Sequence, residues 1–277
     1  MTPARRGFLR GLGPALLGMA FAPAARARCE RVLVVPVAPT GFNVQVLPDG
    51  QVRGVYPDLL RSLEPALGCS FSFPIVPRPR QSLMFFETGE ADLFLPASRT
   101  AERDQKAEFL PMLRLTPTLI TFGASTEAPP ASVEALVARK EWRAVVVRSY
   151  TWGSEYERLL RRLEEQHRVD VVADLKTLGQ MLRAGRVQFT ILPPTLLHSA
   201  LQDGISEARA TQDFRFQLLS GLPPSEVGTY LSTSTLDAET RRRLRRLIEQ
   251  ALAEGRLLQI MGRYYPAEVL KADVQRL

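Results

Sequence analysis

Arginine residues stand near the ends of several apolar, strand-like runs, and they are the side chains best suited to hold a ligand. The set comprises Arg78, Arg80, Arg99, Arg103 and Arg148. A guanidinium is planar, permanently charged and donates paired hydrogen bonds to the two oxygens of a carboxylate. Arg103 also starts a short predicted helix, where the helix N-terminus favours an anion. These residues predict binding of a small anion, with ordinary surface arginines as the alternative.

Hydroxyl and aromatic side chains follow the same runs and are further candidates for a binding site. Ser98 and Thr100 come where a predicted strand over 91–95 ends, with ordinary turn chemistry as the alternative. Phe42 is a candidate lid aromatic and equally a candidate core residue. A polar loop after the predicted strand 143–147 adds Ser149, Tyr150, Thr151, Trp152 and Gly153. Its backbone N–H groups could cradle an anion and its rings could stack on a flat ligand, whereas a plain loop with packed aromatics is the alternative.

Other chemistries lack the residues they need. The two histidines, His167 and His198, are far apart and have no cysteine at ligand spacing, so no metal site is predicted. The sequence has no Gly-x-Ser-x-Gly elbow of a hydrolase. The basic run Arg241–Arg246 is typical of the solvated face of a long helix with Leu244 and Ile248 turned inward. We predict no cofactor, no metal and no nucleic-acid partner.

Strand and helix patterns alternate along the chain and must position these residues. Residues 56–67 have apolar side chains at helical spacing and end at Gly68, whereas Val32–Val37 is an apolar run typical of a buried strand. Repeated alternation of this kind predicts an α/β protein with mostly parallel sheets. A helix, a glycine and a strand recur in the same order at 84–93 and 181–189. This recurrence indicates two similar lobes.

The first 27 residues have the layout of a bacterial export signal. Arg5 and Arg6 begin the sequence Arg-Arg-Gly-Phe-Leu, an uncharged run follows, and small residues end at Ala27. The arginine pair resembles the twin-arginine signal for export of folded proteins, although either export machinery could read such a signal. A membrane anchor is the alternative, but the apolar run is short and contains Gly and Pro. We predict cleavage near Ala27 and a protein of the periplasm.

Removal of this signal would leave a chain with a mild charge. The full chain carries a net charge of +7, and the four arginines among residues 1–27 leave +3 for the other 250 residues. That balance does not argue for nucleic acid, and 250 residues suffice for one large domain or two medium ones. A protein outside the cytoplasm would have no access to ATP or NAD.

The only two cysteines, Cys29 and Cys69, each precede an apolar strand-like run. The runs are separated by a predicted helix, and the strands of such a unit are commonly parallel neighbours. Their N-terminal ends would then lie side by side. We predict a Cys29–Cys69 disulfide, with two unpaired thiols as the alternative. Closing a loop of about 40 residues would stabilise the fold by roughly 3–4 kcal/mol.

Four stretches of the chain resemble the periplasmic solute-binding proteins of the amino-acid-binding type, which are receptor subunits of ABC importers (bacterial extracellular solute-binding protein family 3). Gly54–Leu60 matches the family's Gly-x-x-x-Asp start of the first helix, and Gly89–Asp92 matches its Gly-x-x-Asp turn into the third strand. Arg99–Phe109 contains its Thr-x-Glu-Arg…Phe segment, and Glu249–Tyr264 its C-terminal Gly-x-hydrophobic…Tyr signature. The matches span nearly the whole chain behind the predicted signal.

The resemblance implies a two-lobed type II periplasmic-binding-protein fold, in which each lobe is a mostly parallel sheet flanked by helices. Lobe 1 would comprise 28–113 plus 232–277 and lobe 2 would comprise 118–228, with hinge strands at 113–117 and 229–231. A ligand would lie between the lobes, which close over it. Arg103 would hold the ligand's carboxylate. The protein would be a monomer that delivers its ligand to the membrane subunits of an ABC importer.

One departure from this family changes the expected ligand. Amino-acid binders of this type place an aspartate after a strand of the second lobe to hold the ligand's ammonium, whereas the matching stretch here, Phe189–Pro194, has no carboxylate. An unpaired ammonium would be costly to bury. We therefore predict an anionic ligand without a free α-amine. Two other functions stay open: an enzyme resembling cyclohexadienyl or prephenate dehydratase, for which Glu155 is the nearest candidate acid, and an accessory or sensory module.

Overall fold

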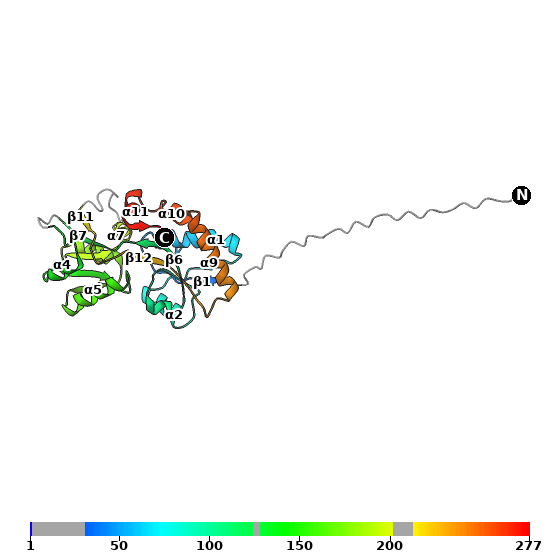
Figure 1. Cartoon of the computed structure of the whole chain (residues 1–277), viewed down its shortest axis with the longest axis horizontal. Coiled ribbons are helices and arrows are strands. Elements are labelled where there is room, and N and C mark those ends of the chain that lie inside the picture. The colour runs from blue at the N-terminus through cyan, green and yellow to red at the C-terminus, as the bar shows by residue number, and fades with distance from the viewer. Residues whose placement is uncertain (2–30, 124–127, 202–212) are drawn as a thin grey trace.

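A computed structural model describes Met1 and residues 31–123, 128–201 and 213–277. Figure 1 shows them as two bodies side by side, one around β7 and β11 and the other around α1, α2 and α9. The strands are β1 (Leu33–Val34), β2 (Gln45–Val46), β3 (Val52–Arg53), β4 (Phe71–Ser72), β5 (Leu93–Ser98), β6 (Glu108–Leu115), β7 (Thr118–Phe122), β8 (Ala144–Val147), β9 (Val169–Val172), β10 (Phe189–Leu192), β11 (Phe214–Gln217), β12 (Ser225–Leu231) and β13 (Val274–Gln275). The helices are α1 (Val55–Leu67), α2 (Arg78–Phe86), α3 (Ala101–Asp104), α4 (Val133–Ala138), α5 (Ser154–Glu165), α6 (Leu175–Arg183), α7 (Pro194–Ala200), α9 (Ala238–Ala253), α10 (Arg256–Met261) and α11 (Ala267–Asp273).

The first lobe is built on a four-stranded sheet with the order β13-β6-β12-β5, and the parallel pair β1–β4 lies in the same lobe. Its core joins these strands to α1, α9 and α10, because each helix turns one apolar stripe inward. Leu59, Leu60 and Leu63 form that stripe on α1 and are almost completely buried. The helix ends at Gly68, whose φ of 75° is the left-handed conformation that glycine adopts without strain.

The second lobe is built on a five-stranded sheet with the order β11-β7-β10-β8-β9. Its separate core includes strands β7, β8 and β10 and the inward faces of α5 and α6. The chain enters this lobe after β6 and returns to the first lobe at β12. The predicted hinges, 113–117 and 229–231, fall at the end of β6 and within β12, and their role as hinges stays a prediction, as do the predicted lobe boundaries.

The predicted α/β class and two-lobed fold are confirmed, but the strand directions differ from the expectation of mostly parallel sheets. Every pairing in the four-stranded sheet is antiparallel, and β7 runs antiparallel to both of its neighbours. Parallel pairing is found between β1 and β4 and along β10-β8-β9. The difference arises because β6 and β12 connect the lobes in opposite directions and pair with each other. Strand–helix–strand units give parallel pairs, so the alternation of strands and helices explains only the parallel pairings.

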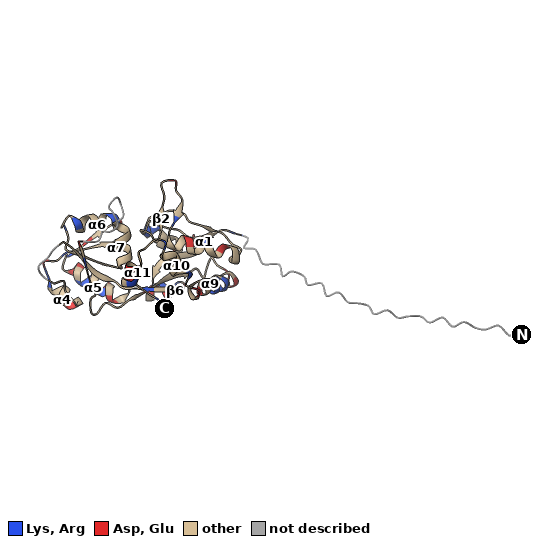
Figure 2. Ribbon diagram, turned by 90° about the horizontal axis from the view of Figure 1, so that it is seen from above, with Lys and Arg blue, Asp and Glu red and all other residues tan. Residues whose placement is uncertain are grey.

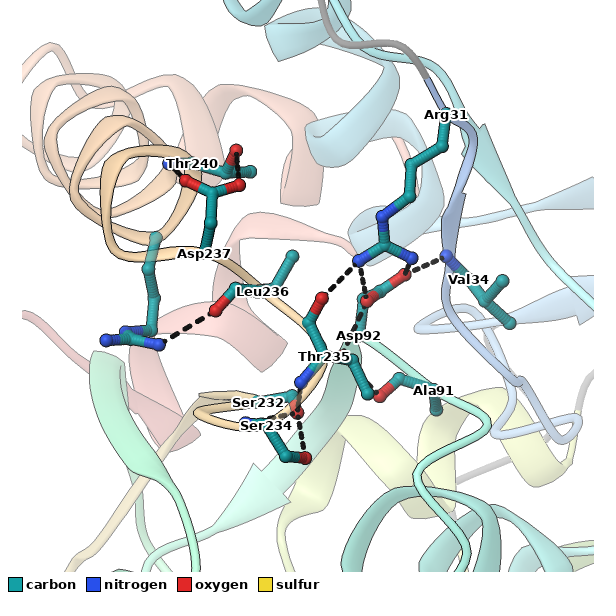
Figure 3. A network of polar contacts seen from close by, with 11 residues as sticks. Arg31, Val34, Ala91, Asp92, Ser232, Ser234, Thr235, Leu236, Asp237 and Thr240 are labelled. Carbon is teal, nitrogen blue, oxygen red and sulfur yellow. Dashed lines mark hydrogen bonds and ion pairs between the residues drawn. The ribbon is translucent and has the colours of Figure 1, made fainter.

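A buried carboxylate, Asp92, fastens the start of β5 to two segments that are distant in sequence (Figure 3). It accepts hydrogen bonds from the main-chain N–H of Val34 at 2.8 Å and the hydroxyl of Thr235 at 2.6 Å. The guanidinium of Arg31 donates to both of its oxygens, at 2.6 and 3.1 Å. The last residue of the Gly-x-x-Asp turn therefore has a structural role in this chain: its charge is balanced and its oxygens are occupied.

The basic run on α9 lies as the sequence predicts, with Leu244 and Ile248 buried in the core. Basic residues recur along this helix in Figure 2. Arg241 and Arg245 form ion pairs with Glu108 of β6. Part of the run therefore serves packing between α9 and the sheet.

Two predictions concern residues outside the described ranges. The export signal, residues 1–27, lies there apart from Met1, and so does Cys29 of the predicted disulfide. The parallel pairing of β1 with β4, on which the Cys29–Cys69 prediction depends, is present, with Leu33 opposite Phe71. The disulfide itself stays a prediction that peptide mass spectrometry with and without reductant would test. Among the described residues, no helix has the length and apolarity needed to cross a membrane.

Candidate functional site

A cavity lies between the two lobes and is lined from both sides. The first lobe contributes most of the wall and the second lobe closes it with residues 149–152 and Leu196. Its volume is about 40 Å³, which is room for two or three water molecules. A solute of several heavy atoms therefore needs the two walls to move apart or the side chains to rearrange. The lining residues are Thr40, Asn43, Tyr56, Arg78, Pro96, Ala97, Ser98, Arg103, Leu115, Ser149, Tyr150, Thr151, Trp152, Leu196 and Val227.

Arg103 is held at this cavity by the local structure of α3. Thr100 caps the helix by accepting a hydrogen bond from the main-chain N–H of Arg103 at 3.2 Å. The half-buried guanidinium of Arg103 donates to the main-chain oxygen of Ser98 at 2.9 Å and lies over the rings of Phe86 and Phe94. Burial lowers the pKa of Arg103 from its ordinary value.

Arg78, the first residue of α2, brings a second guanidinium to the same cavity. Pro77 and Pro79 on either side of it fix the backbone angles at the helix start. The guanidinium donates to the main-chain oxygen of Pro96 at 2.6 Å and lies between the rings of Phe94 and Tyr150, 5.0 and 5.9 Å from their centroids. Burial lowers the pKa of Arg78 to about 10, and the nearby charge of Arg103 adds to this. A nearby anion would offset both effects.

The loop that follows β8 supplies the second lobe's side of the cavity. Two unusual backbone conformations shape it, with φ of 65° at Ser149 and 94° at Gly153. The indole N–H of Trp152 donates to the main-chain oxygen of Ile191 at 3.2 Å, so the ring is buried beneath the loop. The hydroxyl of Thr151 donates to Glu157 at 2.8 Å, in the first turns of α5. These contacts hold the loop in one position next to Arg103.

Direct contacts between the lobes close the cavity. The hydroxyl of Ser98 donates to the main-chain oxygen of Thr151 at 2.5 Å. Tyr150 shares a side-chain hydrogen bond with Thr40 of the first lobe, and burial raises the pKa of its phenol. The lobes therefore meet at the wall of the cavity itself, and parting them there would open it.

A wider outer cleft of about 560 Å³ adjoins the cavity and shares Arg103, Thr151 and Trp152 with it. Its walls carry several acidic residues, and most of them have partners. Thr151 donates to Glu157, and Arg99 forms ion pairs with both Asp104 and Glu226. The outer cleft is therefore more acidic than the inner cavity, because no Asp or Glu of the described part of the chain lines that cavity.

Seven of the twelve residues predicted from the sequence line the cavity. They are Arg78, Ser98, Arg103, Ser149, Tyr150, Thr151 and Trp152. Thr100 and Gly153 line the outer cleft instead. Whether these residues bind a ligand stays a prediction. Eight lining residues were not predicted, namely Thr40, Asn43, Tyr56, Pro96, Ala97, Leu115, Leu196 and Val227.

Three predicted residues do not line the cavity. Arg80 is exposed and forms an ion pair with Glu90 at 2.9 Å. Arg148 is exposed, and its main-chain N–H donates to Val172, which continues the pairing of β8 with β9. Phe42 packs against rings that include Tyr265, so it takes the core role that was its alternative interpretation.

Comparison with solved structures identifies the fold. A histidine kinase sensor domain with similarity to periplasmic binding proteins superposes with a TM-score of 0.69 at 15% identity, over 89% of this chain and 98% of its own. An ancestral arginine-binding protein bound to arginine superposes with a TM-score of 0.68 at 14% identity, over 85% of this chain and 98% of its own. The chain has the fold of the periplasmic binding proteins. An ancestral amino-acid-binding protein described as a precursor of cyclohexadienyl dehydratase superposes with a TM-score of 0.66 at 15% identity, over 85% of this chain and 95% of its own.

The resemblance stated from the sequence motifs is thus confirmed at the level of the fold. No known family model and no curated protein matches the sequence. Solute-binding proteins recur among the structural neighbours. Among the described residues, no group of three His, Cys, Asp or Glu side chains could hold a metal ion.

Proposed function

We propose that this periplasmic-binding-protein fold captures a small solute bearing a carboxylate between its two lobes. The observation that carries this proposal is the cavity between the lobes, where Arg103 stands beside Ser98 and the loop of the second lobe. A guanidinium and a hydroxyl on one wall are suited to a carboxylate, and the facing loop would enclose it. Among the described residues, no carboxylate lines the cavity to receive an ammonium.

The wider role follows from the predicted export signal and the fold. We propose that the protein works in the periplasm and delivers its solute to the membrane subunits of an ABC importer. The sensor-domain neighbour makes signalling the second candidate, because that protein shares the fold at the highest TM-score among the neighbours described above. Uptake of a radiolabelled solute by cells with and without the protein separates them, since a sensor would leave the uptake machinery in place.

A dehydratase reaction receives less support from this site. Such an enzyme needs a carboxyl group placed as a general acid against the substrate. Glu155 and Glu157 lie in the wall of the outer cleft, and neither is among the residues that line the cavity. One neighbour is a dehydratase precursor, and it too is described as an amino-acid-binding protein. Absorbance assays with prephenate would reveal turnover if the outer cleft supplied an acid.

Thermal unfolding against a panel of small acids and amino acids tests the proposed function. A solute at 1,000 times its dissociation constant stabilises the fold by about 4 kcal/mol, or roughly 8–16 °C for a chain of this size. We expect an upward shift with carboxylic acids that Arg103→Ala abolishes. Arg162→Ala is the control, because Arg162 is exposed and pairs only with Glu134 in the second lobe among the described residues. A shift that survives Arg103→Ala would contradict the proposed site.

A further inference from the structure

Two guanidinium groups, rather than one, face the cavity, and the same ring supports both. The guanidinium carbons of Arg78 and Arg103 lie 5.0 and 5.4 Å from the centroid of Phe94. Neither side chain forms a salt bridge with an acidic residue of the described chain. Two like charges held close together with no compensating acid at the cavity are unfavourable without a ligand. A bound group with two negative charges would offset the repulsion between the two guanidiniums.

The main-chain oxygens that accept hydrogen bonds from the two guanidiniums both belong to β5. Arg78 donates to the main-chain oxygen of Pro96 and Arg103 to that of Ser98, two residues further along the strand. Residues two apart on a strand are about 6.6 Å apart and direct their carbonyl groups to the same edge. In a diacid with two or three carbons between its carboxylates, the carboxyl carbons lie roughly 4–5 Å apart, from C–C bonds of about 1.5 Å, and the outer oxygens reach further. Each guanidinium is hydrogen-bonded to one of these two carbonyl groups, so each can take one end of a short-chain diacid.

The rest of the lining favours a ligand with a hydrocarbon body. Leu115, Leu196, Val227 and Trp152 are buried apolar residues in the cavity wall. An inorganic oxyanion such as phosphate would present only polar oxygens to these side chains, whereas methylene groups would pack against them. The cavity wall thus combines two guanidiniums with apolar side chains, and hydroxyl and amide groups such as those of Asn43 and Ser149 complete it.

The carboxylate of Asp273, behind this wall, is not available to a ligand. Asp273 influences the ionisation of Tyr56, which lines the cavity, but Asp273 does not line it. Its oxygens accept hydrogen bonds from the main-chain N–H groups of Thr116 and Thr195 and from the hydroxyl of Thr195. It therefore has no free oxygen directed at an ammonium in the cavity.

We propose that the solute is a short-chain dicarboxylate, with one carboxylate on Arg103 and the other on Arg78. This inference rests on the proposed function and adds a second anion-binding residue and a class of solute to it. Arg78 would then determine specificity, because it distinguishes a diacid from a monoacid of the same length. The acidic outer cleft offers the competing arrangement, in which an ammonium extends from the cavity toward Glu102 or Glu157.

Isothermal titration calorimetry of the protein with malonate, succinate, glutarate and adipate, and with butyrate as the monoacid, tests this inference. We expect succinate or glutarate to bind at least about tenfold more tightly than butyrate, since the second charged pair adds at least 1.4 kcal/mol. Arg78→Gln should remove this preference, so that the diacids bind no more tightly than butyrate. Arg80→Gln is the matched control, because Arg80 is on the same helix but exposed and paired with Glu90.

The same titrations with glutamate, arginine and phosphate separate the alternatives. Equal affinity for diacids and butyrate would overturn the dicarboxylate inference and leave the proposed function standing. Tight binding of arginine or phosphate in place of the diacids would overturn the inference as well. No response to any carboxylate would overturn both. If Arg78→Gln fails to fold by circular dichroism, the chain-length series on the unmodified protein still decides, because a flat series contradicts the spacing argument.

Discussion

The hydroxyl of Ser98, the last residue of β5, donates a hydrogen bond of 2.5 Å to the main-chain oxygen of Thr151 across the boundary between the lobes. Ser98 is also the residue whose main-chain oxygen accepts from Arg103. One residue therefore joins the candidate anion-binding arginine to the contact that holds the lobes together. Ligand binding at Arg103 and closure of the lobes are linked through this residue, because a shift of Ser98 alters both contacts.

Ser98→Ala should weaken lobe closure without unfolding either lobe. The lost hydrogen bond contributes about 0.5–1.5 kcal/mol to the closed arrangement. Small-angle X-ray scattering of the ligand-free protein should give a larger radius of gyration for Ser98→Ala than for the unmodified chain. Ser62→Ala is the control, because the Ser62 hydroxyl also donates to a main-chain oxygen, that of Leu59, but within α1. Equal radii for all three proteins would contradict the closing role of Ser98.

Gly228→Ala should disturb the two strands that connect the lobes. A Cβ at Gly228 would lie 2.1 Å from the main-chain oxygen of Leu110 and 2.9 Å from Cα of Pro111, in the irregular part of the β12–β6 pairing. Backbone atoms cannot move aside as a side chain can, so we expect a loss of about 3 kcal/mol. This corresponds to roughly 6–12 °C in the midpoint of thermal unfolding for a chain of this size.

Gly262→Ala provides the comparison for that substitution. A Cβ there would make only ordinary contacts, 3.5 Å from the nearest main-chain oxygen, and the backbone of Gly262 has φ of −63°. We expect a midpoint equal to or slightly above that of the unmodified protein, because alanine reduces the entropy of the unfolded chain. Similar losses of stability in both variants would show that steric contact of a Cβ at position 228 is not what requires glycine there.

The sequence predicted the elements whose signals are local and missed those that depend on distant partners. Apolar periodicity and a terminal glycine located α1. β11, β13 and most of β6 were not predicted, because their positions depend on the strand beside them rather than on their own pattern. The antiparallel pairing of β6 with β12 could not be inferred from alternation of strands and helices.

The residues of the candidate site also divide into those with a local signal in the sequence and those placed by distant segments. Arg78 and Arg80 were predicted together, but residues two apart on a helix point about 200° away from each other, so only one of them can face the cavity. That geometry was available from the sequence once α2 was known to begin at Arg78. Thr40, Tyr56 and Leu196 line the cavity only because three separate segments meet there, and no local signal identifies them.

Asp92→Ala should be among the more destabilising single changes to a polar residue in the first lobe. It removes the acceptor for the N–H of Val34 and the hydroxyl of Thr235 and leaves Arg31 without its carboxylate partner, although Arg31 still donates to the main-chain oxygen of Thr235. Unsatisfied buried donors cost about 1–3 kcal/mol each, so we expect a loss of at least about 3 kcal/mol in urea unfolding. Glu90→Ala, which removes an exposed ion pair two residues away, should cost less than about 1 kcal/mol. Comparable losses would mean that Asp92 does not hold the segments together.

Asp273 should make the stability of the protein depend on pH. This carboxyl ends α11 and is almost completely buried against Thr116 and the start of α7. Burial raises its pKa from 3.8 to about 6, and the hydrogen bonds from Thr195 only partly oppose that rise. Between these two values the folded chain binds a proton that the unfolded chain releases. The stability contributed by this proton is therefore full below pH 4 and is lost as the pH rises through 6.

Asp273→Asn isolates this effect, because the amide resembles the protonated acid in shape and does not titrate. The free energy of unfolding in urea is measured for both proteins at pH 4.5 and pH 7. Subtracting the values of one protein from those of the other cancels the contributions of all other titrating groups. We expect the unmodified protein to lose about 2 kcal/mol relative to Asp273→Asn over this interval. Thr195→Val should move the transition to higher pH, because it removes a hydrogen bond that favours the carboxylate. A difference between the two proteins that is independent of pH would show that Asp273 does not take up a proton on folding.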